Sequence, residues 1–371
     1  MKKYLTLAAI AALTLASCAK VETSVPTAEK NAIGFAIYSP RALNRADVTN
    51  YADSSILISG ADFDVYGWST KNNVSFNGSN GTQFMNWYTV TYQNDGNTDG
   101  NKNLYPDGKR YWPSGDEPDW LSFYAYYPSN GTTGITAPAG LGEFSFQAQN
   151  AAASQVDFMV ADLVKDKTYE NCTPTQGTVA LTFRHQLTRV QFKFKTTPDV
   201  IKNNTTVTLT DVKLHGIKTS GKLTSSYDGT TFATAWSNQA DTASYEVFVN
   251  GADINNFVLD SLAAPATNAK ADIFLMVPQA MVDKTGDDPQ FVEVHWDVTT
   301  GGVTTHNSKK LYFKNDLKDS DNITAPANAL ALDWAKNASI TYTLTIGPKP
   351  ILFTAEVADW DNETYGYFNV N

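Results

Sequence analysis

Four histidines are the side chains best suited to metal binding or acid–base chemistry. They are His185, His215, His295 and His306. None has a second histidine two or four residues away, nor a cysteine close by, so the spacing of metal ligands is missing. The sequence also lacks the G-x-S-x-G, H-E-x-x-H, P-loop and G-x-G-x-x-G motifs. We therefore expect no metal, no cofactor and hydrogen-bonded structural histidines.

Carboxylates leave one enzymatic alternative open. A glycosidase would need two carboxyl groups facing each other about 5–10 Å apart, and no pair among the 38 Asp and Glu residues stands out. The run Asp95–Gly100 resembles the first half of a calcium loop, but position 12 is Pro106 where glutamate is required. A polar turn is the simpler interpretation, and we expect a protein that is not an enzyme.

Aromatic residues cluster in Tyr111-Trp112-Pro113 and in the run Trp120–Tyr127. An exposed platform of such rings would bind glycans, whereas aromatic residues on strands normally pack in a core or across neighbouring strands. We expect core positions. A surface lipoprotein that binds glycans through exposed aromatics without polymerising is retained as the alternative.

Cys18 follows a segment with the properties of a signal peptide. Two lysines precede an apolar stretch over residues 4–16, which is too short to cross a bilayer. Leu15-Ala16-Ser17-Cys18 resembles a bacterial lipobox, which implies cleavage before Cys18 by lipoprotein-processing enzymes and acylation with palmitate-type chains. Several acyl chains anchor a protein stably. A secreted protein with an incidental Cys18 is the alternative. The other cysteine, Cys172, has no histidine or partner cysteine nearby and is expected to be structural and partly buried.

Composition excludes several classes of protein. The 371 residues carry a formal charge of −10, from 28 basic against 38 acidic residues, so the basic footprint of a nucleic-acid-binding protein is absent. Only 18% of residues are charged and 42% are hydrophobic, which supports folded cores. No apolar run after the N-terminus is long enough to span a membrane.

Alternation of apolar and small residues predicts strands throughout the chain. In the first such segment Ile33, Phe35 and Ile37 share one face. The alternation or a short apolar run recurs at 56–58, 63–68, 84–92, 121–127, 144–146, 156–160, 179–183, 187–194, 207–209, 245–249, 273–277, 291–298, 310–313, 340–346 and 351–357. One or two helical turns are expected at 329–337, and a loop at 93–108. The spacing favours all-β sandwiches and shows no βαβ rhythm.

The ordered set of motifs resembles the fimbrillin family of Bacteroidales, the Mfa-like or FimA-like pilins, over essentially the whole chain. The motifs are Asn44-Arg45-Ala46, Asp62–Gly67, Tyr111-Trp112-Pro113, Leu121–Pro128, Asp157–Ala161, Val179–Leu187, Ile340–Ile346 and Val357–Trp360. The resemblance implies two tandem transthyretin-like β-sandwich domains with Greek-key-type connections. We place a signal peptide at 1–17, a lipidated tether at 18–31, and the two domains at 32–178 and 179–371.

The resemblance also implies an outer-membrane lipoprotein that becomes a structural or tip subunit of a fimbrium and serves adhesion at the cell surface. A trypsin-like protease would cut after Arg45, with Arg41 as the alternative, and so release the first strand. The implied partners are other fimbrial subunits, in a homopolymer or heteropolymer. Glycans or proteins on host or bacterial surfaces are further partners, and nucleic acid is not expected.

The first strand itself makes such a mechanism physically reasonable. If it pairs at a sheet edge, burying Ile33, Phe35 and Ile37 contributes roughly 5–9 kcal/mol. Severing the chain behind it would let it leave and open a groove for an added strand. The C-terminal run 364–370, with Tyr365, Tyr367, Phe368 and Val370, is a candidate donor strand. An ordinary closing strand of the second domain is the alternative interpretation of that run.

Overall fold

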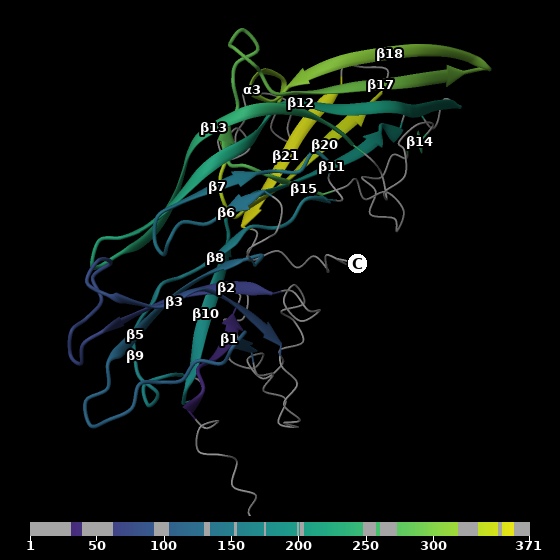
Figure 1. Ribbon diagram of the computed structural model, residues 1–371. Coiled ribbons are helices and arrows are strands. Elements are labelled where there is room, and N and C mark those ends of the chain that lie inside the picture. Colours follow the sequence, from purple (N-terminus) through teal and green to yellow (C-terminus); the bar gives the residue numbers. More distant parts are fainter. Residues whose placement is uncertain are drawn as a thin grey trace, which may run out of the picture.

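The computed structural model describes residues 31–38, 62–92, 104–129, 134–151, 154–173, 176–198, 200, 204–247, 257–259, 273–317, 333–347 and 351–359. These residues form two β-rich lobes stacked along the long axis of the molecule (Figure 1). Within them, no helix combines the length and the apolar character needed to cross a membrane.

A closed ring of seven strands forms the first lobe. The ring runs β2-β3-β4-β1-β10-β8-β5 and closes where β5 pairs with β2, while β9 continues from β8 along the same edge of β5. The strands of this lobe are β1 (Gly34–Tyr38), β2 (Phe63–Thr70), β3 (Thr82–Tyr92), β4 (Leu104–Pro106), β5 (Trp120–Tyr127), β8 (Met159–Ala161), β9 (Val164–Lys167) and β10 (Thr178–His185). The inward residues of these strands fill the interior as one apolar cluster.

Strand β1 has the only parallel neighbour in the ring. It runs parallel to β10, and the six other adjacent pairs are antiparallel. A closed ring with an odd number of strands requires at least one parallel pair. This parallel pair joins β1 to β10, which begins almost 150 residues later in the chain. Pairing of β1 with β10 therefore closes the barrel.

Two sheets packed face to face form the second lobe. One has the order β15-β11-β20-β21, and the other has the order β18-β17-β12-β7-β6 with β13 and β14 also paired to β12. A large apolar core lies between them. Their bounds are β6 (Ile135–Thr136), β7 (Glu143–Gln147), β11 (Thr188–Thr196), β12 (Thr205–Tyr227), β13 (Phe232–Glu246), β14 (Phe257–Val258), β15 (Phe274–Met276), β17 (Phe291–Thr300), β18 (Val303–Tyr312), β20 (Ala338–Ile346) and β21 (Leu352–Asp359). Strands β16 (Gln279–Ala280) and β19 (Asp333–Trp334) form a separate pair, and α3 (Phe313–Asp316) is one helical turn.

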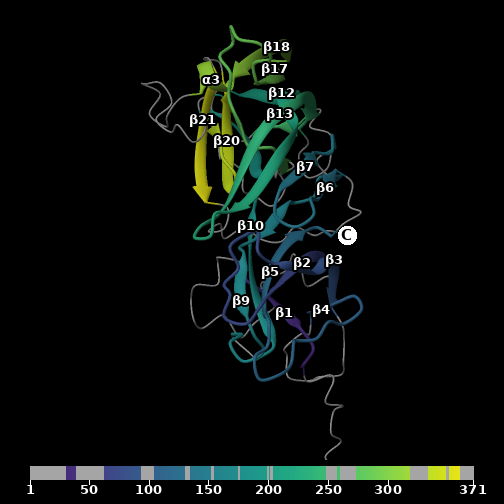
Figure 2. The ribbon, with the colours of Figure 1, turned by 60° about the vertical axis from the view of Figure 1, so that its left-hand side comes forward.

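An aromatic core joins the two lobes. The long strands β12 and β13 extend from the second lobe to the junction (Figure 2). There, Phe144 and Phe146 of β7 pack with Tyr124 and Tyr126 on the outer face of the barrel. Because β7 also pairs with β12 from Ser220 to Thr224, one continuous sheet reaches the barrel wall.

Several sequence expectations are confirmed and others are corrected. The chain is mostly β, as predicted, but the strands of the first lobe close into a barrel. The first strand is an interior member of that barrel rather than an edge strand, because β4 flanks it opposite β10. The boundary expected at residue 178 falls at the start of β10, which still belongs to the first sheet.

Two local predictions are wrong where the structure describes them. Asp333 and Trp334 form β19 instead of the helical turn expected over 329–337, because Trp334 is buried and pairs with Gln279. Residues Leu104–Pro106 form β4 within the predicted loop, because Leu104 fills the barrel beside Phe35. The calcium-like run Asp95–Gly100 lies outside the described residues.

Candidate functional site at the first strand

The inward face of β1 fills the centre of the barrel. Ile33, Phe35 and Ile37 are 0%, 2% and 9% exposed. The Phe35 ring meets Phe123 and Phe63 edge to face, with ring centroids 5.6 and 6.4 Å apart. This alternation of large apolar residues is what the sequence pattern predicts, and each of the three side chains occupies the core of the barrel.

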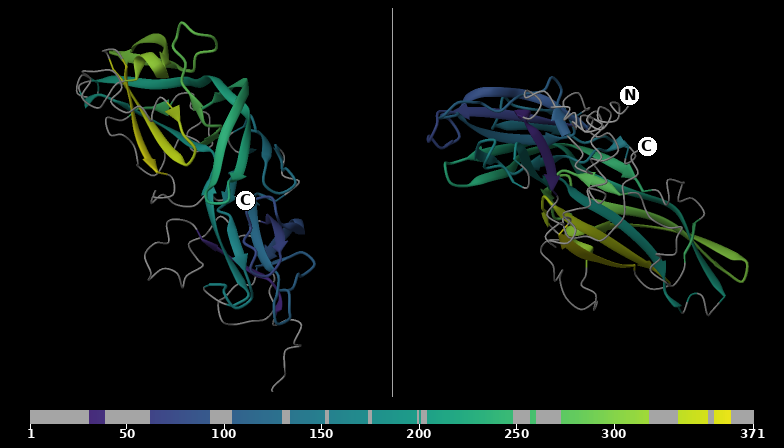
Figure 3. Two further views of the ribbon diagram at one scale, coloured as in Figure 1. Left: turned by 90° about the vertical axis from the view of Figure 1, so that its left-hand side faces the viewer. Right: turned by 90° about the horizontal axis from the view of Figure 1, so that it is seen from below.

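The backbone of β1 is hydrogen-bonded along both edges. Five consecutive residues, Gly34 to Tyr38, stand in register with Thr178 to Thr182 of β10. At the beginning of the strand the Ile33 N–H donates to the carbonyl of Arg110 at 2.8 Å, and the Trp112 N–H donates to the carbonyl of Asn31 at 2.9 Å. Seen from below, β1 is the purple strand along the barrel wall (Figure 3).

The outward face of β1 carries only small side chains over its first positions. Ala32 and Ala36 are 9% and 0% exposed, and Gly34 between them is buried as well. A Cβ atom on Gly34 would lie 3.5 Å from Oγ1 of Thr178 and 3.6 Å from a ring carbon of Tyr105. Side chains from β10 and β4 therefore converge over this position, and it has room for little more than a methyl group.

Gly177, which directly precedes β10, forms the corner at which β1, β10 and Trp112 are joined by hydrogen bonds. Its carbonyl accepts hydrogen bonds from the Gly34 N–H at 3.1 Å and from Nε1 of Trp112 at 3.0 Å. Its φ is +76°, and a Cβ there would lie 2.7 Å from the Tyr169 ring. Only glycine fits this combination of left-handed backbone and close aromatic contact. The sequence did not single out Gly177, Tyr169 or Trp112 for this role, although a glycine just before a strand was a visible signal.

Cys172 belongs to the same end of the barrel and has a structural role, as predicted. It is 5% exposed, packs in the barrel core, and its thiol lies 3.2 Å from the carbonyl of Thr168. Burial raises the pKa of the Cys172 thiol from its ordinary value of 9.0 to about 11. A thiol with this pKa is a poor nucleophile at neutral pH.

The remaining residues proposed from the sequence lie outside the described part of the chain. They are the lipid attachment point Cys18, the cleavage positions Arg41 and Arg45, and the candidate donor residues Tyr365, Tyr367, Phe368 and Val370. Both arginines lie in the connection between the end of β1 at Tyr38 and the start of β2 at Phe63. A cut at either arginine would leave β1 without a covalent link to the rest of the barrel.

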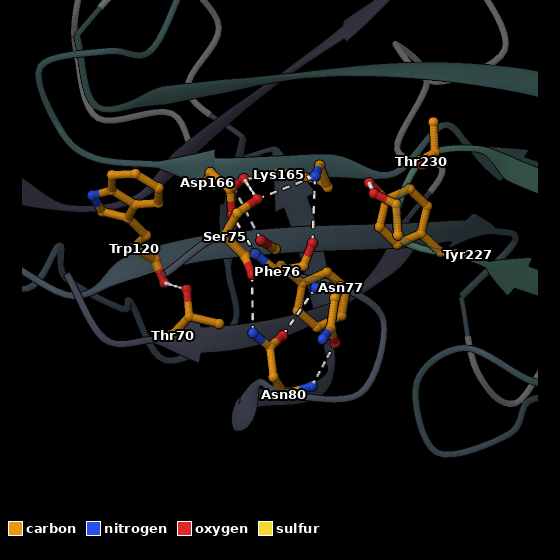
Figure 4. Close-up of polar contacts among 12 residues, drawn as sticks. Thr70, Ser75, Phe76, Asn77, Asn80, Trp120, Lys165, Asp166, Tyr227 and Thr230 are labelled. Atoms are coloured by element: carbon orange, nitrogen blue, oxygen red, sulfur yellow. Dashed lines mark hydrogen bonds and ion pairs between the residues drawn. The ribbon is translucent and has the colours of Figure 1, made fainter. Parts of the chain in front are cut away.

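Away from β1, a cluster of polar residues holds the loop after β2 against β9 and against the tip of the β12–β13 hairpin (Figure 4). Asp166 accepts from Oγ of Ser75 at 2.5 Å and from the N–H of Phe76 at 2.8 Å. Nζ of Lys165 donates to the carbonyl of Phe76 at 3.3 Å and lies 4.9 Å from the ring centre of Tyr227. The hydrogen bond with Tyr227 raises the pKa of Lys165 above its ordinary value. All these groups are mutually paired, so the cluster joins the lobes and does not form a reaction centre.

The four histidines are each paired with a carboxylate. His185 lies 2.6 Å from Asp157 in a buried pair, His306 lies 2.6 Å from Asp297, and His215 and His295 lie 3.3 and 3.8 Å from Glu293. Burial lowers the pKa of His215. Across the described ranges, no three His, Cys, Asp or Glu side chains are grouped so as to hold a metal ion.

Most aromatic residues of the runs singled out from the sequence lie in the core, as expected, while Trp120 is partly buried. Trp112, Tyr124, Tyr126 and Tyr127 are at most 6% exposed, and Tyr111 is 43% exposed. A single exposed ring is not a platform for glycans, so these runs do not support the glycan-binding alternative.

The comparison with protein families decides the identity of this fold. The fimbrillin-like family model matches residues 45–360. The chain belongs to the fimbrillin-like family. This membership agrees with the resemblance carried by the ordered sequence motifs. No curated protein matches the chain.

The comparison with solved structures finds matches at low sequence identity, of which the first shares the fold of this fimbrillin-like protein. A fimbrial protein from Bacteroides vulgatus is 17% identical, with a TM-score of 0.60 over 89% of this chain and 99% of that chain. A protein from Bacteroides uniformis is 16% identical, with a TM-score of 0.47 over 89% of this chain and 98% of that chain. The tip fimbrial protein Mfa3 from Porphyromonas gingivalis, with a C-terminal truncation, is 10% identical, with a TM-score of 0.40 over 83% of this chain and 96% of that chain.

Proposed function

We propose that this fimbrillin-like protein is the lipid-anchored precursor of a structural or tip subunit of a fimbrium. In this proposal Cys18 carries the acyl chains at the outer membrane, and the two lobes correspond to the two transthyretin-like domains of such subunits. A trypsin-like protease cuts after Arg45 or Arg41, β1 departs, and a strand from another subunit takes its place. The assembled subunit serves adhesion at the cell surface and performs no catalysis.

The observation that carries the proposal is the position of β1 as the closing strand of the barrel. Ile33, Phe35 and Ile37 are buried in an apolar cluster to which all six other strands of the ring contribute. Burying Ile33, Phe35 and Ile37 contributes roughly 5–9 kcal/mol, and the backbone hydrogen bonds add about 1 kcal/mol each. The barrel is therefore stable only when some strand fills this position.

Covalent attachment explains why the precursor would not polymerise. As long as β1 is continuous with β2, it occupies its slot at an effective concentration on the order of mM or higher. An incoming strand at lower concentration cannot displace it. After the cut, β1 dissociates as a separate peptide, and the free strand competes only at its own dilute concentration.

Departure of β1 creates a surface that requires a new strand. Residues 178–182 of β10 lose their register partners, and the apolar interior around Phe63 and Phe123 opens to water. Unpaired backbone groups beside an apolar slot are the features that bind an extended segment by β-augmentation. Other fimbrial subunits are the proposed source of that segment.

The proposal is tested by removing both candidate cleavage positions. The double variant Arg41→Ala, Arg45→Ala should keep the first strand covalently attached and abolish polymers, scored by electron microscopy and by unboiled gel electrophoresis. Arg184→Ala is the matched control, since it removes one arginine whose exposed side chain pairs with Asp162. Polymers at the wild-type level in the double variant would contradict the proposal.

Anchoring is tested separately from assembly. The variant Cys18→Ala should lose incorporation of labelled palmitate and should leave the detergent phase on partitioning. Retention of the label in this variant would rule out Cys18 as the lipid attachment point, while strand exchange after proteolysis would still stand.

A further inference from the structure

We propose that the first-strand slot selects its occupant by sequence pattern. It takes an extended segment that runs parallel to β10, in which large apolar residues alternate with alanine or glycine and an aromatic ring occupies the middle. This inference rests on the proposed function and names the class of partner for the same site. It also excludes the C-terminal run of this chain as a good occupant.

The packing of the barrel core explains why the occupant needs large apolar residues at the three inward positions. Phe35 is in edge-to-face contact with two rings, Phe63 and Phe123, at the centre of the slot. Ile33 and Ile37 stand two residues to either side and are buried. A small side chain at the middle position would leave a cavity between these rings, and cavities in well-packed cores are strongly destabilising.

The neighbouring strands explain why the occupant needs alanine or glycine at the two outward positions. Thr178 and Tyr105 converge over Gly34, where even a Cβ atom would be in van der Waals contact with both. Ala36 is fully buried on the same face. A large side chain at Gly34 would have to displace Thr178 and Tyr105, and one at Ala36 would have to displace the atoms that bury it, which costs free energy in a packed site. Large residues are therefore excluded between the inward positions.

The direction of the occupant follows from the hydrogen-bonding groups that line the slot. β10 offers five consecutive register positions to a parallel strand, whereas β4 has a single register position, Leu104 opposite Phe35. At the start of the slot, the carbonyls of Arg110 and Gly177 accept from two successive N–H groups, and the Trp112 N–H donates to one carbonyl. A parallel occupant satisfies all three, since β1 already does so.

The run 364–370 of this chain does not match with any of its three rings in the middle position. With Tyr365 in the place of Phe35, Gly366 would fall on Ala36, but Glu363 would replace Ile33. With Phe368 in the place of Phe35, Tyr367 would fall on Gly34 and Gly366 would replace Ile33. With Tyr367 in that place, Phe368 would fall on Ala36 and Asn369 would replace Ile37. The registers centred on Phe368 and Tyr367 put a large ring on a crowded outward position, and all three registers lose an inward apolar side chain. The slot is therefore better suited to a segment of a different chain.

Peptide exchange into the cleaved protein tests the pattern. The full chain is cut with trypsin under limiting conditions, and mass spectrometry verifies a single cut between β1 and β2. Labelled peptides are then added, and their uptake is followed by fluorescence anisotropy. The peptides are residues 31–38, that peptide with Gly34→Tyr, that peptide with Phe35→Ala, and residues 362–371. Two further copies of the 31–38 peptide carry a nitroxide label at the N-terminus or at the C-terminus and report the direction of binding.

The peptide of residues 31–38 should exchange with β1. The Gly34→Tyr peptide and the 362–371 peptide should bind at least about tenfold more weakly, and the Phe35→Ala peptide about 100-fold more weakly. Equal binding of the Gly34→Tyr or 362–371 peptide would overturn the selectivity. A parallel occupant places its N-terminus beside Trp112, whose N–H donates to the carbonyl of Asn31. The N-terminal label should therefore broaden the Trp112 amide signal in NMR more than the C-terminal label does, and the opposite result would overturn the direction. In those cases strand exchange itself would stand. If β1 never leaves the cleaved protein and the 31–38 peptide never enters, the proposed function fails, and the inference fails with it.

Discussion

Phe35 meets Phe123 edge to face inside the barrel, with the two ring centroids 5.6 Å apart and both side chains buried. This contact joins the first strand of the chain to the centre of the first lobe. Edge-to-face rings contribute about 0.5–1.5 kcal/mol beyond the burial of their area. The contact makes Phe35 the most informative single position at which to test the role of β1.

Phe35→Ala should lower the free energy of unfolding of the uncleaved protein by about 3–5 kcal/mol, because it leaves a cavity between Phe63 and Phe123. Urea denaturation followed by tryptophan fluorescence measures the change. Tyr111→Ala is the control, since this ring is 43% exposed and its loss should shift the free energy by no more than about 0.5 kcal/mol. A loss below about 1 kcal/mol for Phe35→Ala would show that β1 is not integral to the barrel.

Gly177→Ala should destabilise the corner that holds β1 by about 2–4 kcal/mol, the sum of left-handed backbone strain and a clash with Tyr169. Gly108→Ala is a matched control, because Gly108 has φ +68° but no atom within 4 Å of the added Cβ. In the control, the free energy of unfolding should fall only by the cost of the left-handed backbone, about 1–2 kcal/mol. If the two variants lose the same amount in urea denaturation, the predicted contact with Tyr169 does not hold.

Asp166→Asn should loosen the cluster that joins the lobes. Asparagine tolerates the left-handed backbone of this position, where φ is +55°, but provides one acceptor oxygen fewer for Ser75 and Phe76. We expect a loss of about 1–2 kcal/mol and faster amide hydrogen exchange over residues 75–80. Asp162→Asn, in the exposed pair with Arg184, should change stability by about 0–1 kcal/mol. Unchanged exchange at Phe76 would count against the cluster.

Cys172 should make stability depend on pH in the alkaline range. Because burial raises its pKa from 9.0 to about 11, the folded state holds the thiol proton more tightly than the unfolded state. The resulting stability is fully present below about pH 9 and is lost as the pH rises toward about 11. Urea denaturation across this range measures the effect in a Cys18→Ala background, where Cys172 is the only thiol.

The variant Cys172→Ala, in the same background, is the control for that prediction. It should remove the part of the pH dependence that falls between about pH 9 and 11. In the folded protein, Cys172 should also resist alkylation at pH 8 until denaturant unfolds the first lobe. Rapid alkylation without denaturant would contradict its burial.

The alternation of apolar and small or polar residues was sufficient to predict most strands that pack one face against a core. Ile33-Phe35-Ile37 and Ile340–Ile346 alternate cleanly, and both are strands in the structure. The same alternation did not predict the full length of β12, because only residues 207–209 of this long strand were expected to be a strand. Its buried positions toward the end include Thr219 and Ser225, so polar residue types conceal a regular alternation of burial.

What the sequence determined by itself was the all-β class, the buried face of the first strand and the family. Only the tertiary structure decided that this strand lies inside a closed barrel, that Gly177 is its corner, and that its outward positions must be small. Alternation along a strand reports which face is buried, because successive side chains point to opposite sides. It carries no information about which distant strand pairs alongside, and the parallel pairing of Gly34 with Thr178 arises only when the whole ring closes.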